Sequence, residues 1–139
     1  MNSGQCIFCR IVKGEIPAEK VYEDDHALAF LDILPRSPGH VMVIPKTHAK
    51  TFLDLPENLI GPFFLAAQKV LGMLKKALAP DGFTLGINHG KVSGQEVDHL
   101  HLHIMPRWRG DGGHPLQSVI SNPPSEELRI IADRIRGAQ

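Results

Sequence analysis

Three histidines stand at alternate positions in the run His99-Leu100-His101-Leu102-His103-Ile104-Met105. A β-strand sends successive side chains to opposite faces, so this pattern predicts three imidazoles on one face and three apolar side chains on the other. The apolar face can be buried in a core, while the other face presents a row of titratable rings. Five of the eight histidines lie elsewhere in the chain, so the cluster is not a by-product of composition.

Two kinds of chemistry fit this row of imidazoles. In the first, a His-x-His pair and a third histidine hold a catalytic zinc ion, as in carbonic-anhydrase-like sites. In the second, one histidine is a covalent nucleophile, and its neighbours orient it and bind an anion. A strand whose solvent face happens to be histidine is the reading that involves no chemistry.

Two cysteines near the N-terminus give the second chemical signal, because Cys6 and Cys9 are separated by two residues. Two thiols at this spacing supply half of a tetrahedral zinc site. By themselves they could equally be a redox pair or two surface thiols, so the spacing alone leaves all three readings open.

The composition restricts the class of protein. A chain of 139 residues is long enough for one domain with a proper core and no disulfides. Fifteen basic and fifteen acidic residues give a formal charge of zero, which argues against nucleic acid as a partner. No apolar run reaches membrane-spanning length, and residues 1–5 lack the layout of a signal peptide. We therefore expect a cytoplasmic protein that binds neither membrane nor nucleic acid.

The pattern of apolar residues predicts an α+β domain with an antiparallel sheet of about five strands. We expect strands over residues 20–22, 27–32, 40–45, 83–87 and 97–105, with a glycine-rich loop over residues 88–95. Short helices are expected at residues 6–13 and, capped by Ser125, at residues 125–135. One long helix should open on a capping box from Asp54 to Glu57 and run to Leu78. Pro62 should kink this helix or delay its start.

The sequence resembles the histidine triad (HIT) superfamily, whose signature of three histidines alternating with apolar residues it matches in full. The resemblance extends to residues 94–97 before the triad and 105–107 after it, and to residues 6–9, 14–18, 29–33 and 38–48. It covers roughly residues 5–110. It implies a single HIT domain over residues 1–139 with a HIT-like fold, in which residues 111–139 are a C-terminal extension with a helix.

The resemblance implies a role for each part of the triad. His101 is the nucleophile that attacks the α-phosphorus of a nucleotide, and water then hydrolyses the nucleotidyl-histidine. The main-chain carbonyl of His99 orients His101, and His40 supports it from behind. His103 holds the phosphate oxygens together with a further set of residues, mostly backbone donors: Asn88, Gly94, Gln95 and Glu96. Asp32 accepts hydrogen bonds from the ribose. Apolar residues line the base and ribose pocket: Ile7, Phe8, Ile11, Ile16, Phe30, Ile33 and Leu34.

The same resemblance completes the metal site. Zinc-bearing members of the superfamily have ligands that match Cys6, Cys9, His48 and His99. Four protein ligands close the coordination sphere, so the resemblance implies one structural zinc ion per chain.

The expected function is a nucleotide hydrolase or transferase, dimeric by resemblance, acting on adenosine 5′-phosphoramidates or dinucleoside polyphosphates. A nucleotide-binding adaptor with vestigial turnover is the alternative from another class. The chain departs from the human-type branch at Glu96, where that branch has Ser or Thr. A carboxylate is repelled by a phosphate, so we expect Glu96 to bind through its main-chain N–H while its side chain turns away.

Overall fold

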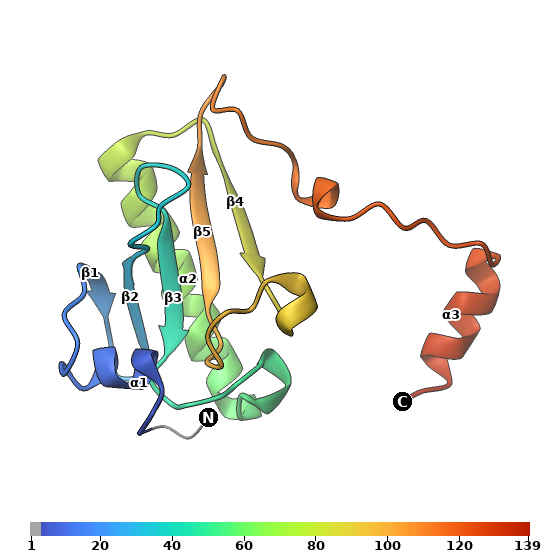
Figure 1. Ribbon diagram of the computed structural model, residues 1–139, viewed down its shortest axis with the longest axis horizontal. Helices are drawn as coiled ribbons and strands as arrows, with labels where there is room; N and C mark the ends of the chain where they lie inside the picture. Colours follow the sequence, from blue (N-terminus) through green and yellow to red (C-terminus); the bar gives the residue numbers. More distant parts are fainter. Residues whose placement is uncertain (1–3) are drawn as a thin grey trace.

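The computed structural model describes residues 4–139, and its centre is a five-stranded sheet (Figure 1). The strands are β1 (Lys20–Glu23), β2 (Ala27–Leu31), β3 (Val41–Pro45), β4 (Gly82–Ile87) and β5 (Leu102–Arg107). Their order is β1-β2-β3-β5-β4, and every neighbouring pair is antiparallel. The predicted α+β class, the strand count and the long helix are therefore confirmed.

The two faces of the sheet are covered by different helices. The long helix α2 (Glu57–Leu78) packs on one face, where its buried residues Phe63 and Val70 meet Val41, Val43 and other strand residues. The short helix α1 (Ile7–Val12) packs on the other face, against Leu28, Phe30, Met42 and Ile44. Consecutive strand residues serve opposite faces, so β2 and β3 are buried on both sides. The residues that were predicted to carry the chemistry lie on the face that α1 covers.

The expected start of the long helix is wrong. The carboxylate of Asp54 accepts a hydrogen bond from the Thr51 N–H (2.9 Å) and closes the short 3-10 turn η1 (Phe52–Asp54), so it does not cap α2. The helix begins only at Glu57, after Pro56. Pro62 does not delay this start, because α2 is continuous across it. The proline removes a single backbone hydrogen bond near the N-terminal end, while the buried face beyond it holds the helix on the sheet.

The segment that carries the triad also differs from the prediction. Residues 97–99 form a bend, and β5 begins only at Leu102. The His99 N–H bonds to the Val97 carbonyl (2.8 Å), and the Leu100 N–H bonds to the Ala49 carbonyl (2.7 Å), outside the strand ladder. The expected strand over residues 97–105 is therefore wrong for its first half. Only His103 of the three histidines lies within a strand.

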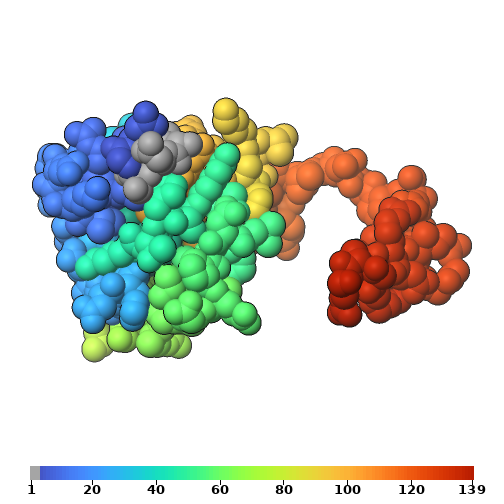
Figure 2. Space-filling model, turned by 90° about the horizontal axis from the view of Figure 1, so that it is seen from below, coloured from blue at the N-terminus to red at the C-terminus, as the bar shows by residue number. Residues whose placement is uncertain are grey.

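Beyond β5 the chain leaves the sheet as an extended arm, clear of the body in two views (Figures 1 and 2). It contains the 3-10 turn η3 (Leu116–Val119) and the helix α3 (Leu128–Arg136). Glu127 precedes the first turn of α3, so the predicted capping role of Ser125 is wrong although the helix itself is present. The arm leaves several large apolar side chains exposed, among them Val119, Leu128 and Ile135.

Candidate functional site

The alternation of the triad segment survives the bend. Leu100, Leu102 and Ile104 are all buried in the core beneath α2, as the pattern predicts. The histidine rings lie on the other side: His101 and His103 meet edge to face, with ring centroids 5.1 Å apart. His99 is completely buried and turns toward the two cysteines instead. The bend thus separates His99, which turns toward the cysteines, from His101 and His103, whose rings lie together; His101 is buried as well.

The ring of His101 is held in one tautomer. Its Nδ1 lies 2.7 Å from the main-chain carbonyl of His99, and a carbonyl oxygen can only accept, so Nδ1 carries the proton. The lone pair is therefore on Nε2. Phe8 packs edge-on against the same ring, with centroids 5.3 Å apart, and fixes its plane. With its proton on Nδ1, His101 has one ring nitrogen, Nε2, free for attack on an electrophile.

A chain of hydrogen bonds determines the tautomer of His103. The backbone N–H of Arg36 donates to Nδ1 of His40 (3.1 Å), so the proton of His40 is on Nε2. That proton is donated to Nδ1 of His103 (2.9 Å), which leaves the proton of His103 on its own Nε2. The expectation that His40 supports His101 is thus corrected, because its ring contacts His103. His103 faces the site as a hydrogen-bond donor.

Burial keeps both members of this pair neutral. Burial lowers the pKa of His103 from 6.5 to about 4, and the neighbouring rings of His101 and His40 add to the shift. Burial also lowers the pKa of His40; the Arg36 charge lowers it further, and only Asp32 opposes the shift. At neutral pH the donor chain from Arg36 through His40 to His103 therefore consists of uncharged rings.

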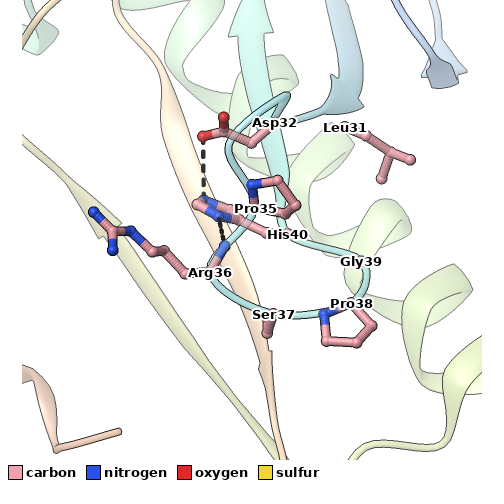
Figure 3. A pocket seen from close by; sticks show the side chains of 8 residues that line it. All are labelled: Leu31, Asp32, Pro35, Arg36, Ser37, Pro38, Gly39 and His40. Carbon is pink, nitrogen blue, oxygen red and sulfur yellow. Dashed lines mark hydrogen bonds and ion pairs between the residues drawn. The ribbon is translucent and has the colours of Figure 1, made fainter.

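Asp32 lies at the edge of this chain. One carboxylate oxygen accepts the N–H of Leu34 (2.9 Å), and the other is 3.6 Å from Nε2 of His40. Beside it a cavity of about 450 Å³ is lined by Asp32, His40 and the loop over residues 35–39 (Figure 3). Two large apolar side chains, Ile33 (90% exposed) and Leu34 (78% exposed), flank the carboxylate. An acceptor beside exposed apolar surface suits a ligand with hydroxyl groups and a flat apolar part.

The other predicted pocket residues fall into two groups. Phe8, Ile11 and Phe30 are buried in the core between α1 and the sheet, and Phe8 packs edge-on against Phe30 (5.5 Å between centroids). Ile16 packs partly buried against the same core, whereas Ile7 is half exposed. None of these residues lines either of the two cavities described for residues 4–139. The buried group supports the ring of His101, and the exposed residues remain free for contact with a ligand.

The glycine-rich loop uses most of its predicted donors internally. The N–H of Gly94 bonds to the Lys91 carbonyl (3.0 Å) in the turn η2 (Lys91–Ser93), and the N–H of Gln95 bonds to the Gly90 carbonyl (3.2 Å). Gly90 and Gly94 have φ angles of 87° and 98°, a conformation that favours glycine. Asn88 lies against Gly94, since a Cβ at Gly94 would be 3.4 Å from the Asn88 amide nitrogen. Of the three predicted backbone donors, Glu96 alone has no intrachain acceptor among the described residues.

The side chains of Gln95 and Glu96 point to different surroundings. Gln95 is buried, and its side chain accepts from the N–H of Gly90 and donates to the carbonyls of Lys50 and Val97. Its side chain therefore closes the loop, and the predicted contact of Gln95 with a nucleotide stays a prediction. Glu96 is exposed, and the expected turn of its carboxylate away from a phosphate stays a prediction.

The second cluster joins Cys6, Cys9, His48 and His99, whose ligand atoms all lie within 4.8 Å of one another. Cys6 is the N-cap of α1 and Cys9 is three residues on, so one helical turn brings both sulfurs together. Nδ1 of His99 is 3.4 Å from the sulfur of Cys6 and 3.5 Å from that of Cys9, and Nδ1 of His48 is 3.3 Å from the Cys9 sulfur.

The hydrogen bonds around this cluster suit a metal. Nε2 of His99 donates to the Pro45 carbonyl (2.8 Å), so the lone pair of Nδ1 points at the sulfurs. Burial lowers the pKa of His99 to about 4, which keeps it neutral as a ligand must be. Burial, and after it the adjacent Cys6, raise the pKa of Cys9 to about 11, so the thiolate form needs a nearby cation. Two thiolates and two neutral imidazoles are the donor set of a closed tetrahedral zinc site.

A third group of ligand types, Asp32, His40 and His103, does not fit a metal in the same way. A metal on Nε2 of His40 requires the proton on Nδ1, where the Arg36 N–H already points. Two donors would then face each other. The hydrogen bonds thus distinguish the two clusters. Those of Asp32, His40 and His103 fit a role in fixing the positions of protons.

The fold and the histidine site together define a small α+β protein in which an imidazole with a free ring nitrogen lies next to a donor imidazole and a carboxylate. The sequence profile described as "HIT domain" matches residues 13–110, and the chain belongs to this family. The adenosine 5′-monophosphoramidase hnt1 of Schizosaccharomyces pombe is 43% identical over 130 residues, which is 94% of this chain and 95% of that protein.

Two solved structures extend the comparison. A HIT family member from Bacillus subtilis has a TM-score of 0.85 at 36% identity and covers 96% of both chains. A zinc-bound histidine triad protein from Mycobacterium smegmatis has a TM-score of 0.74 at 33% identity, covering 99% of this chain and 100% of that one. Within residues 4–139, no helix combines the length and apolar character needed to cross a membrane.

Arg36 is the site residue that the sequence analysis missed. It lies between Pro35 and Pro38 in a loop, and neither its type nor its spacing marks it. Its backbone N–H nevertheless determines the tautomer of His40. The sequence alone could not single out Arg36, because its contact with His40 depends on the conformation of the loop.

Proposed function

We propose that this protein is a nucleotide hydrolase or transferase that cleaves at the α-phosphate of an adenosine nucleotide through a covalent nucleotidyl-His101 intermediate. The observation that carries the proposal is the 2.7 Å contact from Nδ1 of His101 to the His99 carbonyl, because it leaves the lone pair on Nε2. Adenosine phosphoramidates and dinucleoside polyphosphates are the two substrate classes. The named activity of the Schizosaccharomyces pombe relative supports the first of them.

In the first step, Nε2 of His101 uses its lone pair to form a bond to the α-phosphorus, and the bond to the leaving group breaks with its electron pair. The ring becomes a cation whose Nδ1–H is bonded to the His99 carbonyl, a charge-assisted contact that strengthens as the positive charge develops. Water then attacks the phosphorus and gives up a proton to the solvent, and His101 departs as a neutral imidazole; an oxyanion leaving group needs no proton, whereas an amine leaving group takes up one from the solvent. Transfer to another acceptor follows if that acceptor replaces water.

The donors around the phosphorus come from two segments. Nε2–H of His103 and the N–H of Glu96 are free to donate to the non-bridging phosphate oxygens. Phosphoryl transfer is accelerated mainly by positioned donors of this kind. Because the hydrogen bond from His40 fixes the proton of His103 on Nε2, no reorientation is required when the substrate binds.

Asp32 would bind the ribose. Its second carboxylate oxygen, near His40, can accept from the 2′- and 3′-hydroxyls. The exposed Ile33 and Leu34, with Ile7 and Ile16, offer apolar surface for a purine base. A substrate shaped like adenosine monophosphate meets both requirements.

We also propose that Cys6, Cys9, His48 and His99 hold one structural zinc ion. The zinc-bound relative from Mycobacterium smegmatis supports this assignment. The ion would supply a cross-link between α1, the segment after β3 and the bend before β5. Four protein ligands would leave the ion no open coordination position, so the contribution of these residues to catalysis would be to hold the His99 carbonyl in place.

We further propose a homodimer. The arm with α3 lies apart from the body, and its exposed apolar residues, including Leu128 and Ile135, need a covering surface (Figure 2). A second copy of this chain is always available to provide that covering surface. Equilibrium ultracentrifugation would contradict this assignment if the protein were monomeric at micromolar concentration.

The kinetic test of the proposed function is the variant His101→Ala. It should abolish turnover of both substrate classes while AMP still binds, because Asp32 and the apolar residues are unchanged. A variant that kept a tenth of the wild-type kcat, a loss of only about 1.4 kcal/mol, would refute the covalent mechanism. Wild-type protein that binds AMP but turns over neither substrate would instead favour the adaptor function.

A further inference from the structure

A second cavity lies on the same face of the sheet, beyond His103. Its volume is about 370 Å³, and its floor is formed by β4 and β5 with Thr84, Met105 and Arg107. Met105 is two residues after His103, so both side chains point to the same face of β5. The start of the C-terminal arm forms one wall, and Arg36 and Ser37 form the other. We call this cavity the Arg36 groove.

The arm closes the groove at β4. Gly86 pairs with His103 across the sheet, and a Cβ at Gly86 would lie 3.7 Å from a methyl group of Leu116. Because Gly86 has no side chain, there is room for Leu116 to lie over the strand. Together with Met105 and Val119, this leucine makes much of the lining apolar. The groove therefore begins beside the triad and is long enough and apolar enough for an organic group.

Arg36 supplies an uncompensated positive charge at this groove. Its side chain reaches from its loop across β5 toward β4, and it borders both the Arg36 groove and the cavity beside Asp32 (Figure 3). Within residues 4–139 no ion pair or side-chain hydrogen bond engages its guanidinium. Arg107, the other arginine of the groove, is neutralised by Asp111 (2.6 Å) and also donates to Thr84 and to the His114 carbonyl. A free guanidinium at the end of an apolar groove suits a phosphate or sulfate oxygen.

The positions of the protons on His40 and His103 also favour a phosphate or sulfate as the leaving group. His103 can donate a hydrogen bond from Nε2, but giving that proton away would leave an anionic ring, because its Nδ1 already accepts from His40. An amine leaving group needs a proton. A phosphate or sulfate leaves with the electron pair of the broken bond and needs none.

We infer that the Arg36 groove binds the leaving group, and that the preferred leaving group is an oxyanion joined to an apolar or aromatic moiety, as in a dinucleoside polyphosphate. This inference rests on the proposed function. His101 forms the bond to the α-phosphorus, the bridging oxygen departs with its electron pair as part of a nucleoside polyphosphate, and Arg36 binds the released negative charge. Asp32 lies on the nucleoside side and Arg36 on the leaving-group side, so the two charges orient the substrate.

The test compares three substrates that share the adenylyl group: adenosine 5′-phosphoramidate, adenylyl sulfate and diadenosine tetraphosphate. Arg36→Ala keeps the backbone N–H to His40 and removes only the charge. The ratio of kcat/KM for either anionic substrate to that for the phosphoramidate should fall at least tenfold, and Arg36→Lys should restore part of it. Arg109→Ala, which removes an exposed charge outside the groove, should leave the ratios as they are.

A second variant distinguishes the two anions. Leu116→Asp places a like charge in the apolar part of the groove, so it should lower kcat/KM for diadenosine tetraphosphate at least tenfold relative to adenylyl sulfate. Equal losses on all three substrates in Arg36→Ala, with an unchanged melting temperature, would overturn the inference while leaving the proposed function intact. Failure of the proposed function has a different signature, since His101→Ala would then remain active.

Discussion

The buried amide of Gln95 gives the most quantitative prediction about the loop that leads into the triad. Its side chain makes three hydrogen bonds: one from the Gly90 N–H (2.9 Å) and two to the carbonyls of Lys50 (2.7 Å) and Val97 (3.1 Å). Each buried hydrogen bond contributes about 0.5–1.5 kcal/mol to stability. Gln95→Ala should therefore lower the free energy of unfolding by about 3 kcal/mol, which for a chain of this size lowers the melting temperature by roughly 12 °C.

Two further variants make this prediction specific. Gln95→Glu keeps the acceptor for Gly90 but places a carboxylate oxygen against two carbonyl oxygens, so it should destabilise the protein at least as much as Gln95→Ala. Glu96→Ala is the matched control, because Glu96 is exposed next in the chain, and it should change stability by less than about 0.5 kcal/mol.

Urea unfolding and calorimetry measure these changes, and titration with AMP measures binding. If Gln95→Ala melted like the wild type but bound AMP more weakly, the reasoning would be refuted. Gln95 would then contact the nucleotide rather than close the loop.

Three other predictions concern the metal, the ribose and pH. The purified protein should carry about one zinc per chain with zinc–sulfur distances of about 2.3 Å, and Cys9→Ser should lower the melting temperature more than kcat; a metal-free protein of equal stability would argue against the site. Asp32→Ala should weaken AMP binding by about 1.5–3 kcal/mol per lost hydrogen bond and narrow the difference between AMP and deoxy-AMP in calorimetry, whereas an unchanged ratio would assign Asp32 to structure alone. His103 has a pKa lowered from 6.5 to about 4, so the unfolded chain binds the extra proton and stability should fall as pH is lowered from 6.5 toward 4; urea midpoints that fall equally in His103→Asn would contradict this.

Much of the fold could be predicted because its signals are local and periodic. The alternation of residues 99–105 correctly placed Leu100, Leu102 and Ile104 in the core. The start of β5 could not be predicted in this way, because the bend depends on a tertiary contact from Leu100 to Ala49 and on the buried position of His99. The capping box at Asp54 failed for a similar reason, since Thr51 offered that carboxylate a nearer partner.

The types of residue at the site could be predicted from the sequence, but the directions in which their side chains point could not. Cysteine and histidine spacing, with the family resemblance, named all four members of the Cys6, Cys9, His48 and His99 cluster. Which way an amide or a ring points depends on surrounding backbone that the sequence does not reveal. Gln95 therefore turned out to be buried, and His40 turned out to contact His103 instead of His101.

The most direct test of the account is intact-protein mass spectrometry of a rapidly quenched single turnover. Wild-type protein mixed with diadenosine tetraphosphate or adenosine phosphoramidate should gain one adenylyl group, and peptide mapping should locate it on His101. The adduct should be absent in His101→Ala and should form more slowly in His103→Asn, whose shorter side chain places no donor at the position of the histidine Nε2. Full turnover with no adduct, or an adduct on any other residue, would contradict the assignment of His101 as the nucleophile.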